Sequence, residues 1–174
     1  MTTPIMNVAD GPRHAGSHAP AFAYSMTELA GPAGGRTIGA NLTRVPPGRA
    51  AFPFHHHHAN EEHFFILSGT GVVRIGAAVH AVKAYDYVVH LPGGAEHAHQ
   101  LINTGAEDLV YLAISTLRMP EVVGYPDSAK TGVRTDPGEG SRFLIPDAGR
   151  NTTGYWDGED GHRVREIIAA GAPP

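Results

Sequence analysis

The chain has 174 residues, enough for one domain with a hydrophobic core, and a formal net charge of -4. Its basic residues are scattered, which excludes the basic surface of a nucleic-acid binder, and no apolar run approaches the roughly 20 residues that span a bilayer. The absence of cysteine excludes disulfides and thiolate metal sites. Since no export signal opens the sequence, we expect a cytoplasmic protein that binds a small molecule, and neither nucleic acid nor a membrane.

The chain divides into three parts by composition. Residues 1–35 begin with Pro, Gly, Ala and polar residues without periodicity, which predicts a loose arm or a strand awaiting a partner, followed by a first strand. Residues 36–117 are the predicted β core. Residues 118–174 are a predicted C-terminal extension that ends in a short helix.

The core contains short runs rich in β-branched and aromatic residues, separated by Gly, Pro and Asn turn signals. About seven strands at a spacing of about ten residues predict an all-β sandwich or a single barrel. The predicted strands are TIGANLTRV, EEHFFILSG, GVVRIG, AVHAVKA, YDYVVHL, HQLINT and LVYLAIST.

The strand pattern fades after Thr116. The stretch PEVVGYPDSAKTGVRTDPGEG, residues 120–140, predicts a loop with at most one turn of helix. Residues 162–171, HRVREIIAAG, have apolar residues at helical spacing and a closing glycine, which predicts a short C-terminal helix.

Four consecutive histidines, residues 55–58, stand in front of two glutamates. Side chains alternate along a strand, so His55 and His57 share one face while His56 and His58 share the other. Only one pair can face the interior together with a glutamate at the start of the next strand. Alternation alone leaves the choice of pair open.

A second histidine pair, His97 and His99, follows further along the chain. Three imidazoles and one carboxylate converging on one point suit a divalent Fe, Mn, Ni, Cu or Zn ion and leave coordination positions open for chemistry.

Two segments resemble the two motifs of the cupin superfamily. Residues 48–69, GRAAFPFHHHHANEEHFFILSG, resemble the first motif, and residues 92–103, PGGAEHAHQLIN, resemble the second. The count back from Gly69 selects Glu62, and the His-x3-Asn count selects His99. The second loop is two residues longer than the usual pattern, and at the usual spacing His97 is the ligand.

The resemblance implies a cupin-type jelly-roll barrel with one divalent transition metal as cofactor. The spacing from Gly48 and the position of Pro53 are similar to many cupins and favour the pair His55 and His57. The implied metal ligands are therefore His55, His57, Glu62 and His99.

His97 is the candidate catalytic residue, as a proton-transfer or substrate-orienting group. We expect His56 and His58 to face outward or to support the ligands at most. His63 is expected to be a packing or surface residue, and His90 a hydrogen-bonded core histidine.

YPDSAK and YWDGED, residues 125–130 and 155–160, resemble the C-terminal segments of bacterial single-domain cupins of the sugar-phosphate-isomerase-like group. The expected function is a metal-dependent oxygenase or isomerase acting on a small organic substrate. The alternative is a binding or sensing module without turnover. The N-terminal arm and the resemblance favour a homodimer.

Overall fold

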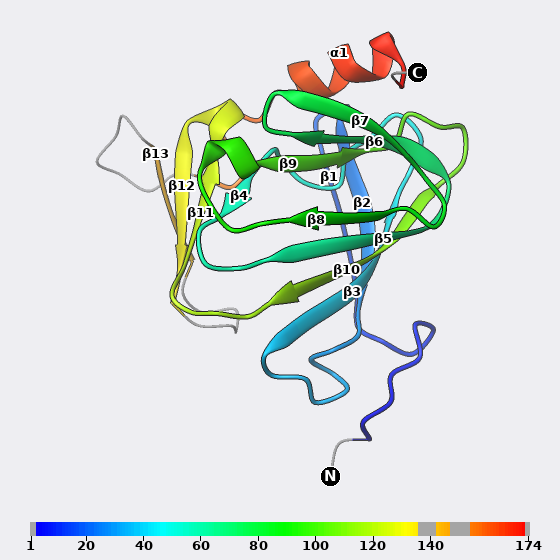
Figure 1. The fold of residues 1–174 in the computed structure, drawn as a ribbon, viewed down its shortest axis with the longest axis vertical. Helices are drawn as coiled ribbons and strands as arrows, with labels where there is room; N and C mark the ends of the chain where they lie inside the picture. The colour runs from blue at the N-terminus through cyan, green and yellow to red at the C-terminus, as the bar shows by residue number, and fades with distance from the viewer. Residues whose placement is uncertain (1–2, 136–141, 147–153, 173–174) are drawn as a thin grey trace.

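The computed structural model describes residues 3–135, 142–146 and 154–172 (Figure 1). Its elements are thirteen strands, two 3-10 turns and one α-helix within those ranges. In chain order they are β1 Arg13–His18, β2 Phe22–Glu28, β3 Ile38–Val45, β4 His56–His57, β5 Glu62–Ser68, β6 Thr70–Ile75, β7 Ala78–Lys83, β8 Tyr87–His90, η1 Ala95–His97, β9 His99–Ile102, β10 Leu109–Thr116, β11 Glu121–Tyr125, η2 Pro126–Ser128, β12 Lys130–Arg134, β13 Arg142–Pro146 and α1 His162–Ala170.

The strands pack as a jelly-roll sandwich in which all strand pairs are antiparallel. The three sheets have the orders β1-β2-β3-β10-β5-β8, β7-β6-β9 and β13-β12-β11-β4, and across the described residues they do not join into one closed ladder. The all-β prediction is confirmed, and each of the seven predicted strands has its counterpart among β3 and β5–β10. The first residues are not a loose arm throughout, because β1 pairs with β2 along its whole length.

The prediction for residues 120–140 was wrong where the structure describes them. β11 and β12 pair in register from Glu121 opposite Arg134 to Tyr125 opposite Lys130, with only η2 between them. The runs are short and interrupted by Gly124 and Gly132, so their strand signal is weak without partners. Residues 136–140 of that prediction lie outside the described ranges.

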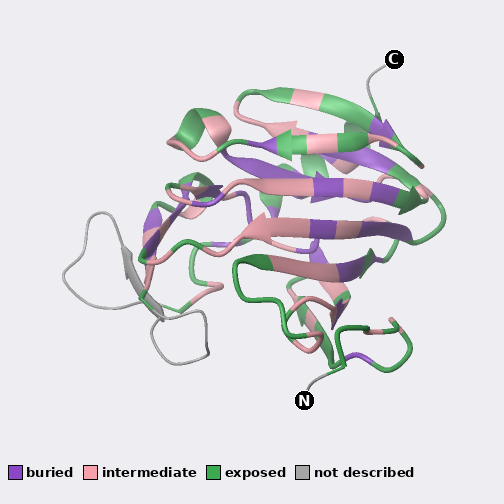
Figure 2. Cartoon of the chain, turned by 60° about the horizontal axis from the view of Figure 1, so that its bottom comes forward, coloured by how far each residue is buried: buried purple, intermediate pink, exposed green. Residues whose placement is uncertain are grey.

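The main core lies inside the sandwich, between the β10-β5 face and β6, β7 and β9. Figure 2 shows buried and partly exposed residues alternating along these strands, as expected for sheets with one inward face. The buried members of this main core are Val45, Ala51, Phe64, Ile66, Val73, Val82, Leu101, Leu109, Tyr111 and Ala113. This packing holds β5 and β9, which carry Glu62 and His99, in fixed positions.

The C-terminal helix is confirmed as α1. Its buried residues Val164 and Ile167 pack against Phe22, Val72 and Ile102 in a second cluster. Gly171 ends the helix at a positive φ of 74°, a conformation that glycine adopts without strain. Figure 1 shows α1 beside β6 and β7, away from the β12 side of the molecule.

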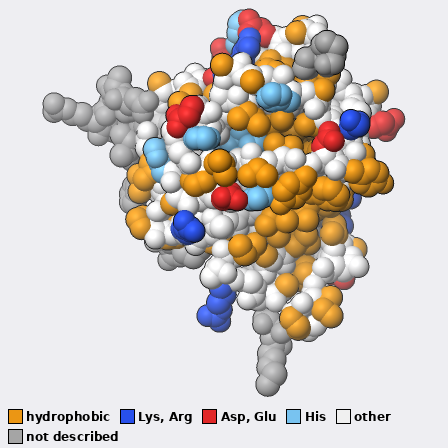
Figure 3. Space-filling view, in the orientation of Figure 1, with side chains coloured by type: hydrophobic (Ala, Val, Ile, Leu, Met, Phe, Trp, Pro, Cys, Tyr) orange, Lys and Arg blue, Asp and Glu red, His pale blue; other side chains and the backbone are white. Residues whose placement is uncertain are grey.

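One face of the molecule carries exposed apolar side chains, which Figure 3 shows gathered over β5 and β8. They include Leu67, Tyr85, Tyr87, Val89 and Leu91. The homodimer stays a prediction.

Within the described ranges no helix has both the length and the apolar character needed to cross a membrane.

Candidate metal centre

The run of four histidines forms the short strand β4 and the residue on each side of it. His56 and His57 pair with Gly124 and Val123 of β11, and His55 forms a bridge with His99. The extended backbone turns His55 and His57 toward the interior, where both line a cavity. Alternation thus separates the two pairs, as the sequence predicted.

The structure brings His55, His57, Glu62 and His99 together. Each offers one ligand atom, and the four atoms lie within 4.8 Å of one another. Nε2 of His99 is 2.9 Å from Oε2 of Glu62, and Nε2 of His57 is 3.9 Å from the same oxygen. These are the four residues selected from the sequence as metal ligands, and metal binding itself stays a prediction.

The outer ring nitrogens of the three histidines have contacts that orient the rings. Nδ1 of His55 lies 2.8 Å from the carbonyl oxygen of Pro53, and Nδ1 of His99 lies 3.4 Å from that of His97. Nδ1 of His57 is buried without a hydrogen-bond partner among the described residues, 3.8 Å from Oε2 of Glu121. All three rings therefore turn Nε2 toward Glu62, as metal-binding histidines held by outer contacts do.

Glu121 of β11 is a buried carboxylate, 1% exposed, placed directly behind His57. Its Oε1 accepts hydrogen bonds from the backbone N–H groups of His58 at 3.0 Å and Ala59 at 3.1 Å. Its Oε2 accepts a hydrogen bond from the side-chain amide of Asn60. These donors fix the carboxylate beside the His57 ring, so strand β11 supports a ligand that lies more than sixty residues earlier.

The electrostatics favour a neutral imidazole at His55 and an ionised carboxylate at Glu62, the forms that bind metals. Burial and the neighbouring His99 and His57 hold the pKa of His55 well below its usual value. Burial raises the pKa of Glu62, but the hydrogen bond to His99 and the nearby imidazoles outweigh it, so the pKa lies far below its usual range.

His57 differs from the other ligands in its charge environment. Burial lowers its pKa, but the carboxylates of Glu121 and Glu62 outweigh burial and the opposing charge of Arg134, so the pKa is raised. His57 thus lies between two carboxylates, those of Glu62 and Glu121.

His56 does not line the cavity, in keeping with alternation, but it is buried and not exposed as an outward-facing residue would be. His56 is 8% exposed, its Nδ1 lies 2.8 Å from the carbonyl oxygen of Gly93, and its ring occupies the space that a side chain at position 124 would fill. Because Gly124 has no Cβ, β11 can pair closely with β4 and cover the ring. His58, by contrast, is exposed as expected.

His97 is not brought to the cluster. It ends η1, and its side chain is 37% exposed, 3.6 Å from the carboxylate of Glu96. The 3-10 turn breaks the alternation that would have set His97 on the same face as His99. Nothing in this geometry supports a catalytic role for His97.

The remaining histidines of the core region have structural contacts. His63 lies between Glu61 and Tyr87, with 2.7 Å contacts to each, on the outer side of β5. His90 is buried and stacks on His99 with ring centroids 3.8 Å apart. Neither ring nitrogen of His90 has a hydrogen-bond partner in the described part of the chain, contrary to expectation, and burial lowers its pKa to about 3.

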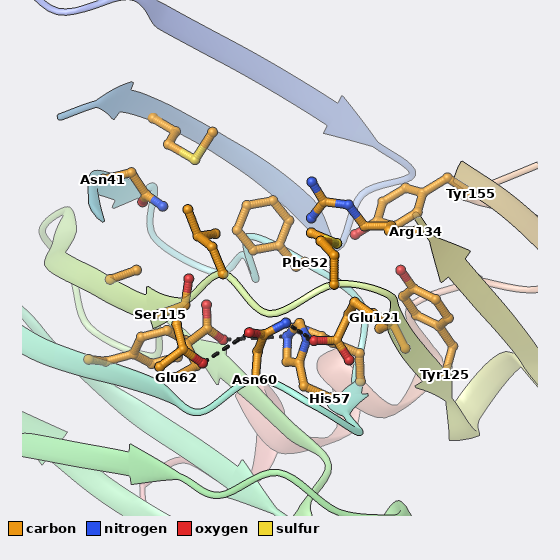
Figure 4. Close-up of a pocket in the computed structure, with 18 of the residues that line it drawn as sticks. Asn41, Phe52, His57, Asn60, Glu62, Ser115, Glu121, Tyr125, Arg134 and Tyr155 are labelled. Carbon is orange, nitrogen blue, oxygen red and sulfur yellow. Dashed lines mark hydrogen bonds and ion pairs between the residues drawn. The ribbon is translucent and has the colours of Figure 1, made fainter. Parts of the chain in front are cut away.

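A cavity of about 270 Å³ opens beside the cluster (Figure 4). One side comes from the core strands and the other from β11, β12 and the turn at residues 154–157. The core side includes Asn41, Phe52, His55, His57, Glu62, Phe64, Tyr111 and Ser115, and the other includes Glu121, Val123, Tyr125, Arg134 and Tyr155. Phe64 lines the cavity, whereas Ile66 is buried in the core.

The sequence reading missed the second side of the cavity. Glu121, Tyr125 and Arg134 stand in a stretch interpreted as loop, and their strand pairing with β4 and with one another places them at the site. The alternation of Glu121, Val123 and Tyr125 was the available signal, because residues two apart on a strand share a face.

The chain resembles known proteins in sequence and in fold. The family model described as Cupin domain matches residues 41–115. A search of curated proteins finds no match. A protein of Acidithiobacillus ferrooxidans that carries the provisional name sugar phosphate isomerase is 29% identical, with a TM-score of 0.66 over 74% of this chain and 80% of its own.

Two further structures share the fold. A sugar phosphate isomerase from a cupin superfamily, from Silicibacter pomeroyi, has a TM-score of 0.72 at 22% identity and covers 85% of this chain and 96% of its own. A predicted oxalate decarboxylase from Thermotoga maritima has a TM-score of 0.57 at 23% identity, covering 66% and 99%. Residues 41–115 thus match the cupin family model, and the chain shares the fold of these cupin-type structures.

Proposed function

We propose that this protein is a metal-dependent enzyme that acts on a small organic molecule. The observation that carries the proposal is the set of three imidazole nitrogens and one carboxylate oxygen within 4.8 Å, three of whose four residues line a cavity. A cavity of about 270 Å³ suits a molecule of a few heavy atoms better than a polymer.

The residues fit a transition metal. His55, His57 and His99 turn the same ring nitrogen toward Glu62, and the carboxylate of Glu62 is ionised at neutral pH. Such a nitrogen and oxygen set suits Fe, Mn, Ni, Cu or Zn. When bound, the ion would polarise a substrate oxygen or activate a bound oxygen species.

The surrounding residues would shape and orient the substrate. The rings of Phe52, Phe64 and Tyr111 form apolar walls that restrict water at the cluster. Asn41 lines the same cavity, where its Oδ1 accepts a hydrogen bond of 2.7 Å from Thr43, and its amide N–H₂ is oriented by that contact. Glu121 and Asn60 hold His57 in place and are fully engaged in doing so.

Two reaction types are in question, isomerisation and oxygenation. The name of the Acidithiobacillus protein, which is 29% identical, favours isomerisation. An aldose–ketose isomerase that works by general acid–base catalysis needs a group that carries a proton between neighbouring atoms of the substrate.

One observation favours a second candidate, a binding or sensing module without turnover. Of the two carboxylates that line the cavity in the described residues, Glu62 belongs to the cluster and Glu121 has both oxygens occupied. His97 lies away from the cavity. A free proton carrier beside the substrate is therefore not evident among these groups.

The two candidates separate in one set of assays. Untagged protein is loaded in turn with Fe, Mn, Ni, Cu or Zn, and oxygen uptake and the conversion of aldose and ketose phosphates are followed. Turnover that His57→Ala abolishes supports the enzyme. If the protein binds a substrate tightly but does not turn it over with any of the five metals, the enzyme proposal is overturned in favour of the binding module.

A further inference from the structure

Arg134 is the one lysine or arginine that lines the cavity in the described residues. It stands at the end of β12, opposite Glu121 in the β11–β12 ladder. Figure 4 shows Arg134 beside Tyr155, across the cavity from Glu62 and His57. A positive charge therefore faces the same space as the metal-binding cluster, from the other side.

The natural counter-ion of Arg134 is already committed elsewhere. Glu121 lies directly across the ladder, but its oxygens accept hydrogen bonds from His58, Ala59 and Asn60. The described residues offer Arg134 no ion pair and no hydrogen bond, although its side chain is only partly exposed. A partly buried guanidinium without a partner keeps its five donors available for an anion.

Aromatic rings connect the two ends of the cavity. The Tyr125 ring stacks near His55 with centroids 6.1 Å apart, and it meets Tyr155 edge-on at 5.7 Å. Tyr155 is held by a turn whose next residues, Asp157 and Glu159, contact the buried Lys130. The wall between the cluster and Arg134 is thus largely aromatic, which suits the middle of a small two-ended molecule.

We propose that Arg134 binds the anionic end of the substrate, a carboxylate or a phosphate monoester, while a hydroxyl or carbonyl oxygen at the other end faces the His–Glu cluster. This names the substrate class of the proposed function and so rests on it: a small oxygen-bearing organic anion. The planar fork of arginine pairs with carboxylate and phosphate oxygens through two parallel hydrogen bonds.

The test measures the binding of glycolate and of inorganic phosphate by titration calorimetry. Wild type is compared with Arg134→Gln, with Arg134→Lys and with the control Arg44→Gln, which removes the same charge from an exposed position on β3. Each protein is titrated both free of metal and loaded with Zn²⁺, after thermal unfolding has shown that it is folded.

We expect Arg134→Gln to weaken the binding of at least one of the two anions by about tenfold or more, since charged hydrogen bonds are being lost. Arg134→Lys should recover part of the loss, and Arg44→Gln should stay within about twofold of wild type. Glycolate and phosphate distinguish the carboxylate from the phosphate source.

Equal affinities of wild type and Arg134→Gln for both anions would overturn the inference, as would the absence of binding in both metal states. A protein that takes up no Zn²⁺ but still loses anion binding in Arg134→Gln would refute the metal proposal and leave the anion site standing. The two failures are therefore separable.

Discussion

The two sides of the cavity come from different parts of the chain and carry different chemistry. The side from residues 41–115, which match the cupin family model, supplies the four clustered residues. The opposite side, from β11, β12 and the turn at 154–157, lies beyond the matched residues and supplies Glu121, Tyr125, Arg134 and Tyr155. On our proposal, the first side binds the ion and the second side binds the substrate. Glu121 is the residue that joins them, because it supports His57 from the far side.

The largest effect should follow from a change on the domain side. His57→Ala removes a direct ligand, and we expect metal affinity to fall at least about 100-fold, beyond the 10–100-fold typical for loss of an outer partner. Metal content after dialysis measures it. His58→Ala, one residue along and exposed on the opposite face, is the matched control and should retain the metal. Equal metal content in both variants would remove the distinction between the two histidine pairs.

A change on the extension side should affect folding without affecting the ion. Lys130 is buried and pairs with Glu159 at 2.6 Å, so Lys130→Met leaves a buried carboxylate without its partner. We expect the free energy of unfolding to fall by about 3–5 kcal/mol, measured by urea titration of the metal-free protein. The double variant Lys130→Met/Glu159→Met should recover most of the loss. A single variant as stable as wild type would mean that the pair does not hold the extension.

The residue that joins the two sides should show an intermediate effect on metal affinity. Glu121→Gln keeps the size of the side chain but removes the charge beside Nδ1 of His57. We expect metal affinity to fall about 10–100-fold with the stoichiometry unchanged, as measured by competition with a chelator. The control is Glu61→Gln, which removes a carboxylate next in sequence to Glu62 but paired with His63 on the outer side. If Glu121→Gln binds metal as wild type does, the two sides of the cavity are independent.

The smallest expected effect concerns the packing between β4 and β11. A Cβ at position 124 would overlap the buried ring of His56, so Gly124→Ala should lower the free energy of unfolding by about 1–3 kcal/mol. Gly31→Ala, where an added Cβ meets nothing within 4 Å, should stay within about 0.5 kcal/mol of wild type. Thermal and urea unfolding measure both variants. An unchanged Gly124→Ala protein would contradict the placement of His56.

The domain side could be predicted from sequence because its signals are local. The seven core strands show their own residue pattern, and strand alternation sorts the four histidines without any knowledge of the partner strands. Spacing from Gly69 and to Asn103 then selected Glu62 and His99, which the structure places together.

The extension side could not be predicted in the same way because its structure depends on distant partners. His56 is buried only because Gly124 lies across the β4–β11 ladder, and Glu121 acquires its role from backbone groups of His58 and Ala59. β11 and β12 are short and contain glycine, so the pairing determines them more than their own propensity does. His97 lies away from the cluster because it ends the 3-10 turn η1 and does not belong to β9.

The central claim is that one transition metal binds to the inner histidine pair with Glu62 and His99. An anomalous difference map, collected at the metal edge from crystals of untagged and metal-loaded protein, tests it most directly. We predict one peak at about 2.0–2.3 Å from Nε2 of His55, His57 and His99 and from a carboxylate oxygen of Glu62. No peak there, or a peak on the side of His56 and His58, would contradict the account.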